Sequence, residues 1–266
     1  MRRTIAALAL TTSLAACLPS PSGADRSELL WPDGAPLSHG KREHDRPRLY
    51  YYLPDPAQQN GAAVVVASGG SYGHHGGLRV EGEPTARWLR DQGFVAVIVR
   101  YRVGEVGGYD HRAFFADGAR AVRVVRSQAA ELGIAPDRVG FIGFSAGGHL
   151  GASLGTRCAA GPVQDKPLDA LSCRPDFAIL VYPVITMDEP HVHKRSRKNL
   201  LGGADDPPPA LLTRLSVERQ ASALSSPTLL VHSRRDRKVD FENSELFYNA
   251  LRQHGVEAEL LLFDDG

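Results

Sequence analysis

The stretch that decides the fold is a short run of apolar and small residues near the middle of the chain. It reads Arg138-Val139-Gly140-Phe141-Ile142-Gly143-Phe144-Ser145-Ala146-Gly147-Gly148-His149-Leu150. Strand-forming residues come first, and the five residues from Gly143 to Gly147 then match G-x-S-x-G, in which a serine stands on a sharp strand-to-helix turn. Small residues must flank Ser145, because bulk there would clash with the neighbouring strand and helix. The run therefore predicts a strand, a tight turn that carries a nucleophilic serine, and a helix.

Apolar runs on both sides of this stretch alternate with amphipathic ones. Short apolar runs predict strands at residues 49–53, 62–67, 94–100, 177–181, 229–232 and 256–263, and periodic segments predict helices at residues 83–92, 116–132 and 242–254. Such alternation produces a mostly parallel sheet with helices on both faces, so the fold class is α/β. Residues 188–223 interrupt the alternation and predict a small lid insertion over the strand ends.

The composition is that of a single α/β domain, which we place at residues 49–266. The 266 residues carry a net charge of +1, which gives no electrostatic reason to expect nucleic acid or another acidic partner. The chain shows no internal repeat and no apolar run long enough to span a membrane. Any contact with a membrane is therefore expected only through a lipid anchor.

The N-terminus has the pattern of an export signal. Two arginines precede an apolar stretch, residues 5–14, that is too short to span a bilayer. The next residues, up to Cys17, resemble a bacterial lipobox, in which the cysteine becomes the lipidated first residue, and Leu18 fits sorting to the outer membrane. The alternative is an ordinary secretory signal. We expect a signal peptide at residues 1–16, a tether and irregular segment at residues 17–48, and an exported protein, lipid-anchored to the outer membrane on its periplasmic or cell-surface side.

The cysteine count agrees with an oxidising compartment. If Cys17 carries lipid, Cys158 and Cys173 form the one pair left among the three cysteines. A disulfide between them would close a loop of roughly 15 residues and contribute about 3 kcal/mol in the chain-entropy model. Two free buried thiols are the alternative.

Several motifs resemble the α/β-hydrolase superfamily, and within it the small acetyl-esterase and acetylxylan-esterase-like (carbohydrate esterase) group. The similarity runs from about Tyr51 to the C-terminus. The residues that carry it are Ser68-Gly69-Gly70-Ser71-Tyr72, Arg100-Tyr101-Arg102, Pro136-Asp137-Arg138, Phe144-Ser145-Ala146-Gly147-Gly148-His149-Leu150, Tyr182-Pro183-Val184, His232 and Asn243-Ser244. The resemblance implies the α/β-hydrolase fold with a serine nucleophile.

A serine nucleophile needs a base to take its proton and a carboxylate to orient that base. In this fold the chain order is serine, acid, histidine. The resemblance implies that the acid is Asp236, in a segment that matches the family's Asp-x-x-Val pattern. It also implies that backbone N–H groups of Gly70 or Ser71, together with that of Ala146, bind the oxyanion.

The expected base does not follow the last predicted strand. The family's histidine stands in a loop after that strand, whereas this sequence reads Leu262-Phe263-Asp264-Asp265-Gly266 and stops. We interpret this end as a truncation rather than a redesign. His74 and His75 in the oxyanion loop and His149 in the helix after the serine are the alternative candidates for the base, but for His149 we expect a packing role.

The sequence thus predicts a serine carboxylesterase that hydrolyses small acyl esters, acetyl esters above all, of small molecules or carbohydrate through an acyl-Ser145 intermediate. No cofactor is implied. No metal is expected at His191-Val192-His193 either, because no carboxylate stands at matching spacing, and the basic run at residues 194–198 is interpreted as a solvated lid face. Two alternatives stay open: a peptidase of the prolyl-oligopeptidase type, and a catalytically inactive, surface-anchored binding protein on the same fold.

Overall fold

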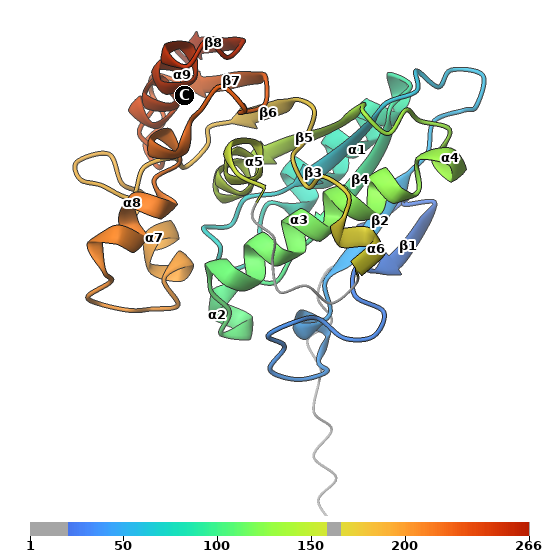
Figure 1. Ribbon diagram of the computed structural model, residues 1–266, viewed down its shortest axis with the longest axis horizontal. Coiled ribbons are helices and arrows are strands. Elements are labelled where there is room, and N and C mark those ends of the chain that lie inside the picture. Colours follow the sequence, from blue (N-terminus) through green and yellow to red (C-terminus); the bar gives the residue numbers. More distant parts are fainter. Residues whose placement is uncertain (1–20, 159–165, 266) are drawn as a thin grey trace, which may run out of the picture.

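A computed structural model describes residues 21–158 and 166–265. At its centre is an eight-stranded sheet in the order β1-β2-β4-β3-β5-β6-β7-β8 (Figure 1). The strands are β1 (Arg26–Leu29), β2 (Arg48–Tyr52), β3 (Ala63–Ala67), β4 (Val95–Arg100), β5 (Val139–Phe144), β6 (Ala178–Val181), β7 (Thr228–Ser233) and β8 (Ala258–Phe263). Pairings of β1 with β2 and of β2 with β4 are antiparallel, and all others are parallel. The predicted mostly parallel sheet is confirmed.

Helices cover both faces of the sheet (Figure 1). They are α1 (Glu83–Asp91), α2 (Gly104–Gly107), α3 (His111–Ser127), α4 (Ala129–Leu132), α5 (Ala146–Thr156), α6 (Lys166–Asp169), α7 (Lys194–Leu200), α8 (Pro209–Leu215) and α9 (Glu242–Gln253), with the short helical turns η1 (Glu43–Asp45), η2 (Leu78–Gly82) and η3 (Val217–Gln220). Alternate residues of β3 pack into two separate apolar clusters, Val64 against α1 on one face and Val65 against α3 and α5 on the other. Within the predicted lid lie α7, α8 and η3.

One end of the α1 face is left open. Leu261 and Phe263 of β8 are 38% and 50% exposed. Leu261 continues the row of Phe144 and Val181 across the sheet, and Phe263 lies two residues further along β8, on the same face. Among the described residues, α1 covers only the β2–β4–β3 part of this face. On the opposite face α9 packs on β7 and β8.

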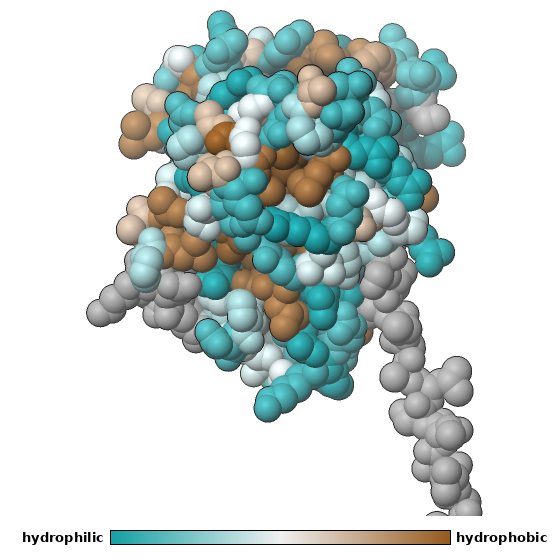
Figure 2. Space-filling model, turned by 90° about the vertical axis from the view of Figure 1, so that its right-hand side faces the viewer, coloured by the Kyte–Doolittle hydropathy of each residue, from teal (hydrophilic) through white to brown (hydrophobic). Residues whose placement is uncertain are grey.

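The N-terminal segment is more ordered than the sequence predicts. Residues 17–48 were expected to be a tether and an irregular segment, but β1 joins the sheet beside β2. Its residues have little strand propensity, so the pairing depends on tertiary contacts. Gln128 supplies one of them, because its side chain bonds both Glu28 and Tyr51 at 2.9 Å. The side of the molecule that carries β1 is largely hydrophilic, with separate hydrophobic patches (Figure 2).

The predicted helix over residues 116–132 is also different in detail. It begins earlier, at His111, because Asp110 caps it by accepting from the Arg112 N–H at 2.9 Å. It is interrupted at Gln128, after which α4 continues to Leu132. The same glutamine that bonds β1 and β2 therefore stands at the break between the two helices.

A buried ion pair fixes the loop that follows β1. The side chains of Arg102 and Asp117 are both 0% exposed and lie 2.8 Å apart. Asp117 also accepts from the Trp31 indole N–H at 2.8 Å and from the Arg102 backbone N–H at 3.0 Å. The carboxylate thus joins the end of β4, α3 and the N-terminal loop, and all its charge is compensated within the protein.

Candidate active site

Ser145 stands on a strained turn between β5 and α5. Its backbone has φ 51° and ψ −115°, a region that non-glycine residues occupy only where the surrounding structure enforces it. Its N–H donates to the Val181 carbonyl at 3.0 Å, and its carbonyl accepts from the N–H groups of His149 and Val184, each at 3.1 Å. These bonds hold the serine at the end of the sheet, in the sharp turn that the sequence predicts.

The turn is possible because the glycines around Ser145 have no side chain. A Cβ at Gly143 would lie 2.2 Å from the Gly147 carbonyl oxygen, and one at Gly147 would lie 2.3 Å from the carbonyl oxygen of Ala67. Both distances are far shorter than a van der Waals contact. The first helical turn of α5 therefore packs directly on the end of β3, as the sequence argument requires.

Adding a methyl group at Gly147 should destabilise the protein, whereas adding one at Gly155 should not. Both glycines lie in α5, but a Cβ at Gly155 would meet only Ser226, at 3.4 Å. We expect Gly147→Ala to lower the free energy of unfolding by about 1–3 kcal/mol, the cost of overpacking. Gly155→Ala should raise it by up to about 1 kcal/mol, because alanine favours helix. Urea unfolding measures both, and equal stabilities would contradict the tight packing of the turn.

The loop after β3 presents unbonded backbone N–H groups. Gly70, Ser71 and Tyr72 all have positive φ, at 134°, 55° and 59°. A Cβ at Gly70 would lie 1.9 Å from the His74 carbonyl oxygen, so only glycine fits there. Within the described parts of the chain, the N–H groups of Gly70, Ser71 and Ala146 find no acceptor. They are the three donors that the resemblance implies for an oxyanion.

The loop after β7 holds Asp236 by its own backbone. One oxygen of the carboxylate accepts from the N–H groups of Lys238 at 2.7 Å and Val239 at 3.1 Å. The other lies 3.6 Å from Nε2 of His232, a buried ring that also bonds Ser244. Asp236 is thereby fixed at the carboxyl end of β7, the position expected for the acid.

One cavity of about 510 Å³ collects the predicted site residues. Ser145, Asp236, Gly70 and Ser71 all line it, although they come from four different segments. Much of the remaining lining is polar or charged and was not predicted: His74, Glu81, Tyr182, His193, Arg195 and Lys238. Tyr182 stands in one of the family motifs, but no local pattern marks Glu81, His193 or Arg195 as cavity residues, because the turn η2 and the lid bring them there.

His149 has a packing role, and both of its ring nitrogens are bonded. Nδ1 lies 2.9 Å from the Tyr72 hydroxyl and Nε2 lies 2.8 Å from the Leu215 carbonyl. Burial lowers the pKa of His149 to about 4. The imidazole is therefore neutral at pH 7 and joins the loop after β3 to the lid helix α8.

This buried imidazole should make the protein sensitive to acid. The pKa of His149 falls from 6.5 in the unfolded chain to about 4 in the folded one. The contribution of its neutral ring to the free energy of unfolding is therefore complete above pH 6.5 and is lost as the pH falls through 4. Linkage predicts a loss of about 3 kcal/mol between pH 7 and pH 4. Urea unfolding across this range should show a steeper decline for the wild type than for His149→Gln. Parallel pH profiles would contradict the prediction.

The two histidines that line the cavity have their Nδ1 atoms occupied. Nδ1 of His74 accepts from the Gly76 N–H at 2.9 Å, and Nδ1 of His193 accepts from the Ser196 N–H at 3.2 Å. In each neutral ring the proton is then on Nε2, which makes that atom a donor. The structure places His193, for which the sequence predicts no role, at the cavity, where it also caps α7.

His191 lies beside two carboxylates that are distant in the sequence. Its Nδ1 is 2.7 Å from Asp240, and the ligand atoms of His191, Asp240 and Glu242 all fall within 4.8 Å of one another. The sequence argument against a metal here is that no carboxylate stands at matching spacing along the chain. In the folded protein, however, two carboxylates lie beside His191. The ion pair of His191 and the N-terminus of α9, where acidic residues are favourable, account for these contacts.

Two of the three cysteines lie among the residues that the structure describes. A disulfide joins Cys158 to Cys173, with Cα atoms 5.3 Å apart. Cys17 lies outside the described residues.

Within the described parts of the chain, no helix is both long and apolar enough to cross a membrane.

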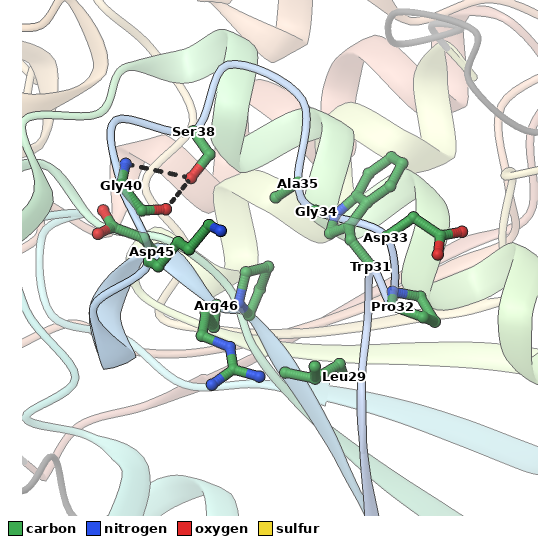
Figure 3. Close-up of a pocket in the computed structure, with 12 residues that line it drawn as sticks. Leu29, Trp31, Pro32, Asp33, Gly34, Ala35, Ser38, Gly40, Asp45 and Arg46 are labelled. Carbon is green, nitrogen blue, oxygen red and sulfur yellow. Dashed lines mark hydrogen bonds between the residues drawn. The ribbon is translucent and has the colours of Figure 1, made fainter.

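A second cavity, of about 370 Å³, lies in the N-terminal segment, lined by Trp31, Asp45 and Arg46 among others (Figure 3). It contains none of the predicted site residues. Two of its lining side chains are held by residues behind them: Asp45 accepts from the Tyr109 hydroxyl at 2.6 Å, and one face of Trp31 is covered by the guanidinium of Arg120 at 4.3 Å. This cavity therefore belongs to the packing of the N-terminal loop.

The sequence is similar to those of known proteins. A family model described as BD-FAE matches residues 49–251. An acetylxylan esterase of Xylanibacter ruminicola is 33% identical over 213 residues, which are 79% of this chain and 41% of that protein. Endo-1,4-beta-xylanase B of Butyrivibrio fibrisolvens is 30% identical over 224 residues, 83% of this chain and 34% of that protein. The chain thus spans well under half the length of these two curated relatives.

Solved structures agree in fold. An acetyl ester-xyloside bifunctional hydrolase from Caldicellulosiruptor lactoaceticus has a TM-score of 0.77 and 35% identity, covering 94% of this chain and 88% of that one. A thermophilic esterase from Thermogutta terrifontis has a TM-score of 0.72 and 26% identity, and the match covers 92% of this chain and 83% of that one. The chain belongs to the BD-FAE family, and its fold is that of the α/β-hydrolases.

Proposed function

We propose that the protein is a serine carboxylesterase that hydrolyses small acyl esters, acetyl esters above all, carried by carbohydrate or another polar alcohol. The observation that carries the proposal is the convergence of Ser145, Asp236 and the unbonded N–H groups of Gly70 and Ser71 on one cavity. A nucleophile, an acid and oxyanion donors in one place are the parts that acyl transfer needs. The esterases among the relatives support the same reaction class.

In this proposal the Ser145 hydroxyl attacks the ester carbonyl and gives a tetrahedral intermediate. The N–H groups of Ala146 and of Gly70 or Ser71 bind its oxyanion. The alcohol then leaves with a proton, and water hydrolyses the acyl-serine to release the acid and restore the hydroxyl. Asp236 orients and stabilises the histidine that carries these protons.

The identity of the base is the part of the mechanism to be tested first. His74, His193 and His149 each have Nδ1 occupied and a proton on Nε2, so none of them has a free basic nitrogen for Ser145. The resemblance implies a histidine after β8, and no histidine follows Phe263 in the printed sequence. We propose comparing residues 1–266 with the same residues extended by a C-terminal segment that carries the family's histidine: a base at that place predicts weak turnover for the first and full turnover for the second, and full turnover of the first would show that a base is already present.

The lining of the cavity supports a small acyl group on a polar alcohol. Arg195, Lys238, Tyr182 and Glu81 offer hydrogen-bond donors and acceptors of the kind that sugar hydroxyls use, and Val239 is one of the few apolar groups. A long acyl chain would need an extended apolar channel. Nothing in this lining supplies one.

The substrate assay uses p-nitrophenyl acetate, butyrate and octanoate, acetylated xylo-oligosaccharides, and a glycyl-prolyl anilide as a peptidase substrate. We expect the highest kcat/KM for acetyl esters, a steep fall with acyl length, and no anilide cleavage. Preference for octanoate or cleavage of the anilide would contradict the proposal. If the full-length protein neither hydrolyses any ester nor reacts with a fluorophosphonate, the proposal fails and the inactive binding protein is the alternative that remains.

We also propose export with lipid attachment at Cys17, on the lipobox-like residues that precede it. In cells fed labelled palmitate, the mature protein should carry the label and Cys17→Ser should not, because lipid is attached only to that thiol. Equal labelling of the two proteins would exclude attachment at Cys17.

A further inference from the structure

Glu81 places a carboxylate in the cavity of Ser145, and both of its oxygens are hydrogen-bonded. Oε2 accepts from the backbone N–H of Gly69 at 2.6 Å, and Oε1 accepts from the hydroxyl of Tyr182 at 3.2 Å. Burial, and then the charge of Glu81, raise the pKa of Tyr182, so its hydroxyl stays protonated and able to donate. The reaction described above gives Glu81 no part.

The two bonds of Glu81 go to the segments that surround the serine. Gly69 immediately precedes Gly70 and Ser71, whose N–H groups have no acceptor among the described residues. Tyr182 follows β6 with φ 37°, directly after Val181, the residue whose carbonyl accepts from the Ser145 N–H. One carboxylate therefore spans the oxyanion loop and the strand end that holds the nucleophile.

Packing around this carboxylate leaves almost no freedom. A Cβ at Gly69 would lie 3.0 Å from Cβ of Ser145 and 3.2 Å from Oε2 of Glu81. A Cβ at Gly77 would lie 1.9 Å from the same oxygen. Two glycines, one on each side, thus allow the carboxylate to reach the Gly69 N–H beside the serine.

The backbone of η2 sets the position of Glu81. This turn is a π-helix, a geometry that is rare and often found at functional sites. The N–H groups of Glu81 and Gly82 both donate to the Gly77 carbonyl, at 2.7 Å and 3.2 Å. Gly77 therefore positions Glu81 in two ways. Its carbonyl accepts from the Glu81 N–H, and its lack of a side chain leaves room for the Glu81 carboxylate.

We propose that Glu81 is a positioning residue for the oxyanion loop: by accepting from Gly69 and Tyr182 it holds the N–H groups of Gly70 and Ser71 where the oxyanion forms. The inference rests on the proposed esterase function. A negative charge so close to a developing oxyanion would by itself raise the barrier. The benefit of Glu81 must therefore come from the geometry of its two hydrogen bonds, and not from its charge.

The test separates geometry from charge with three variants of the full-length protein. Glu81→Ala removes both hydrogen bonds. Glu81→Gln keeps an oxygen for the Gly69 N–H and offers an amide to Tyr182, but has no charge. Gly77→Ala leaves the carboxylate present and displaces it. Each variant is measured for kcat and KM on p-nitrophenyl acetate and for inhibition by an arylboronic acid, which forms a tetrahedral adduct with serine.

We expect Glu81→Ala to lower kcat by about 10²-fold, the cost of misplacing a catalytic group by roughly 1 Å, with KM nearly unchanged. Boronate affinity should fall in parallel, because the adduct uses the same N–H groups. Gly77→Ala should reproduce this loss, and combining it with Glu81→Ala should add little, since both remove one interaction. Glu81→Gln should restore most of kcat.

Glu83→Ala is the matched control. This residue lies two positions further along the same segment, and its carboxylate bonds Ser22 at 2.8 Å, away from the cavity. It should lower the melting temperature and leave kcat unchanged. Full kcat in Glu81→Ala, or a fall in KM alone, would overturn the positioning role while leaving the esterase intact. A Glu81→Gln variant as impaired as Glu81→Ala would also overturn it. A wild type without ester turnover would overturn the proposed function, and this inference with it.

Discussion

Replacing Ser145 by alanine, in a chain that carries the histidine expected after β8, should lower kcat for p-nitrophenyl acetate by roughly 10⁵–10⁶-fold, as losing the nucleophile of a comparable triad does. The reason is structural: Ser145 is the one serine on the positive-φ turn between β5 and α5. Without its hydroxyl no acyl-enzyme can form. The oxyanion donors remain, so a residual acceleration of about 10³-fold over water should persist.

The measurement needs a control for the fold and a control for the chemistry. Ser127→Ala removes a hydroxyl at the end of α3 that donates to the Val124 carbonyl of the same helix at 2.8 Å. This variant should leave kcat unchanged. Fluorophosphonate should label the wild type and not Ser145→Ala. Wild-type turnover in Ser145→Ala, with an unchanged melting temperature, would show that another residue is the nucleophile.

The second large effect is expected on stability, from the buried pair of Arg102 and Asp117. Both side chains are 0% exposed, so Asp117→Ala leaves a guanidinium in the interior with no countercharge. Breaking a buried pair in this way costs about 3–5 kcal/mol, a large part of the 5–15 kcal/mol that stabilises an ordinary domain. The loss of the Trp31 acceptor adds to it and frees the N-terminal loop.

Urea unfolding at pH 7 measures this cost, and Glu131→Ala provides the comparison. Glu131 pairs with Arg26, but the two side chains are 59% and 36% exposed, and exposed pairs contribute at most about 1 kcal/mol. Both carboxylates contact the N-terminal segment, Asp117 through the Trp31 indole and Glu131 through Arg26, so the two variants differ mainly in burial. Similar losses for the two variants would contradict the importance of burial.

The parts of this protein that the sequence predicts are those encoded by local patterns. Continuous apolar runs identify β3 and β4, because buried parallel strands are apolar on both faces. The turn at Ser145 is recognisable because it needs glycine at fixed positions, and Asp236 because its segment has a family pattern. In each case a few neighbouring residues determine the local structure.

The parts that were missed depend on distant residues. The strand β1 has no strand pattern of its own and exists because β2 and Gln128 offer partners. Glu81 reaches the cavity only because the π-turn η2 and Gly77 leave room for it. His193 lies at the cavity because the lid folds back over the sheet. No spacing along the chain encodes these contacts.

The hydrogen bonds between the lid and the oxyanion loop have a kinetic consequence. Asn199 of α7 donates to the Ser71 carbonyl at 2.9 Å, and the buried imidazole of His149 connects Tyr72 to the end of α8. A swing of the lid would break these bonds and disturb the loop that we propose for oxyanion binding. We therefore expect substrate and product to exchange past the exposed rim at Val80 and Lys238 while the lid stays in place. Turnover then does not wait for the microsecond-to-millisecond closure of mobile lids, and we expect diffusion and the acyl-transfer steps to set its rate.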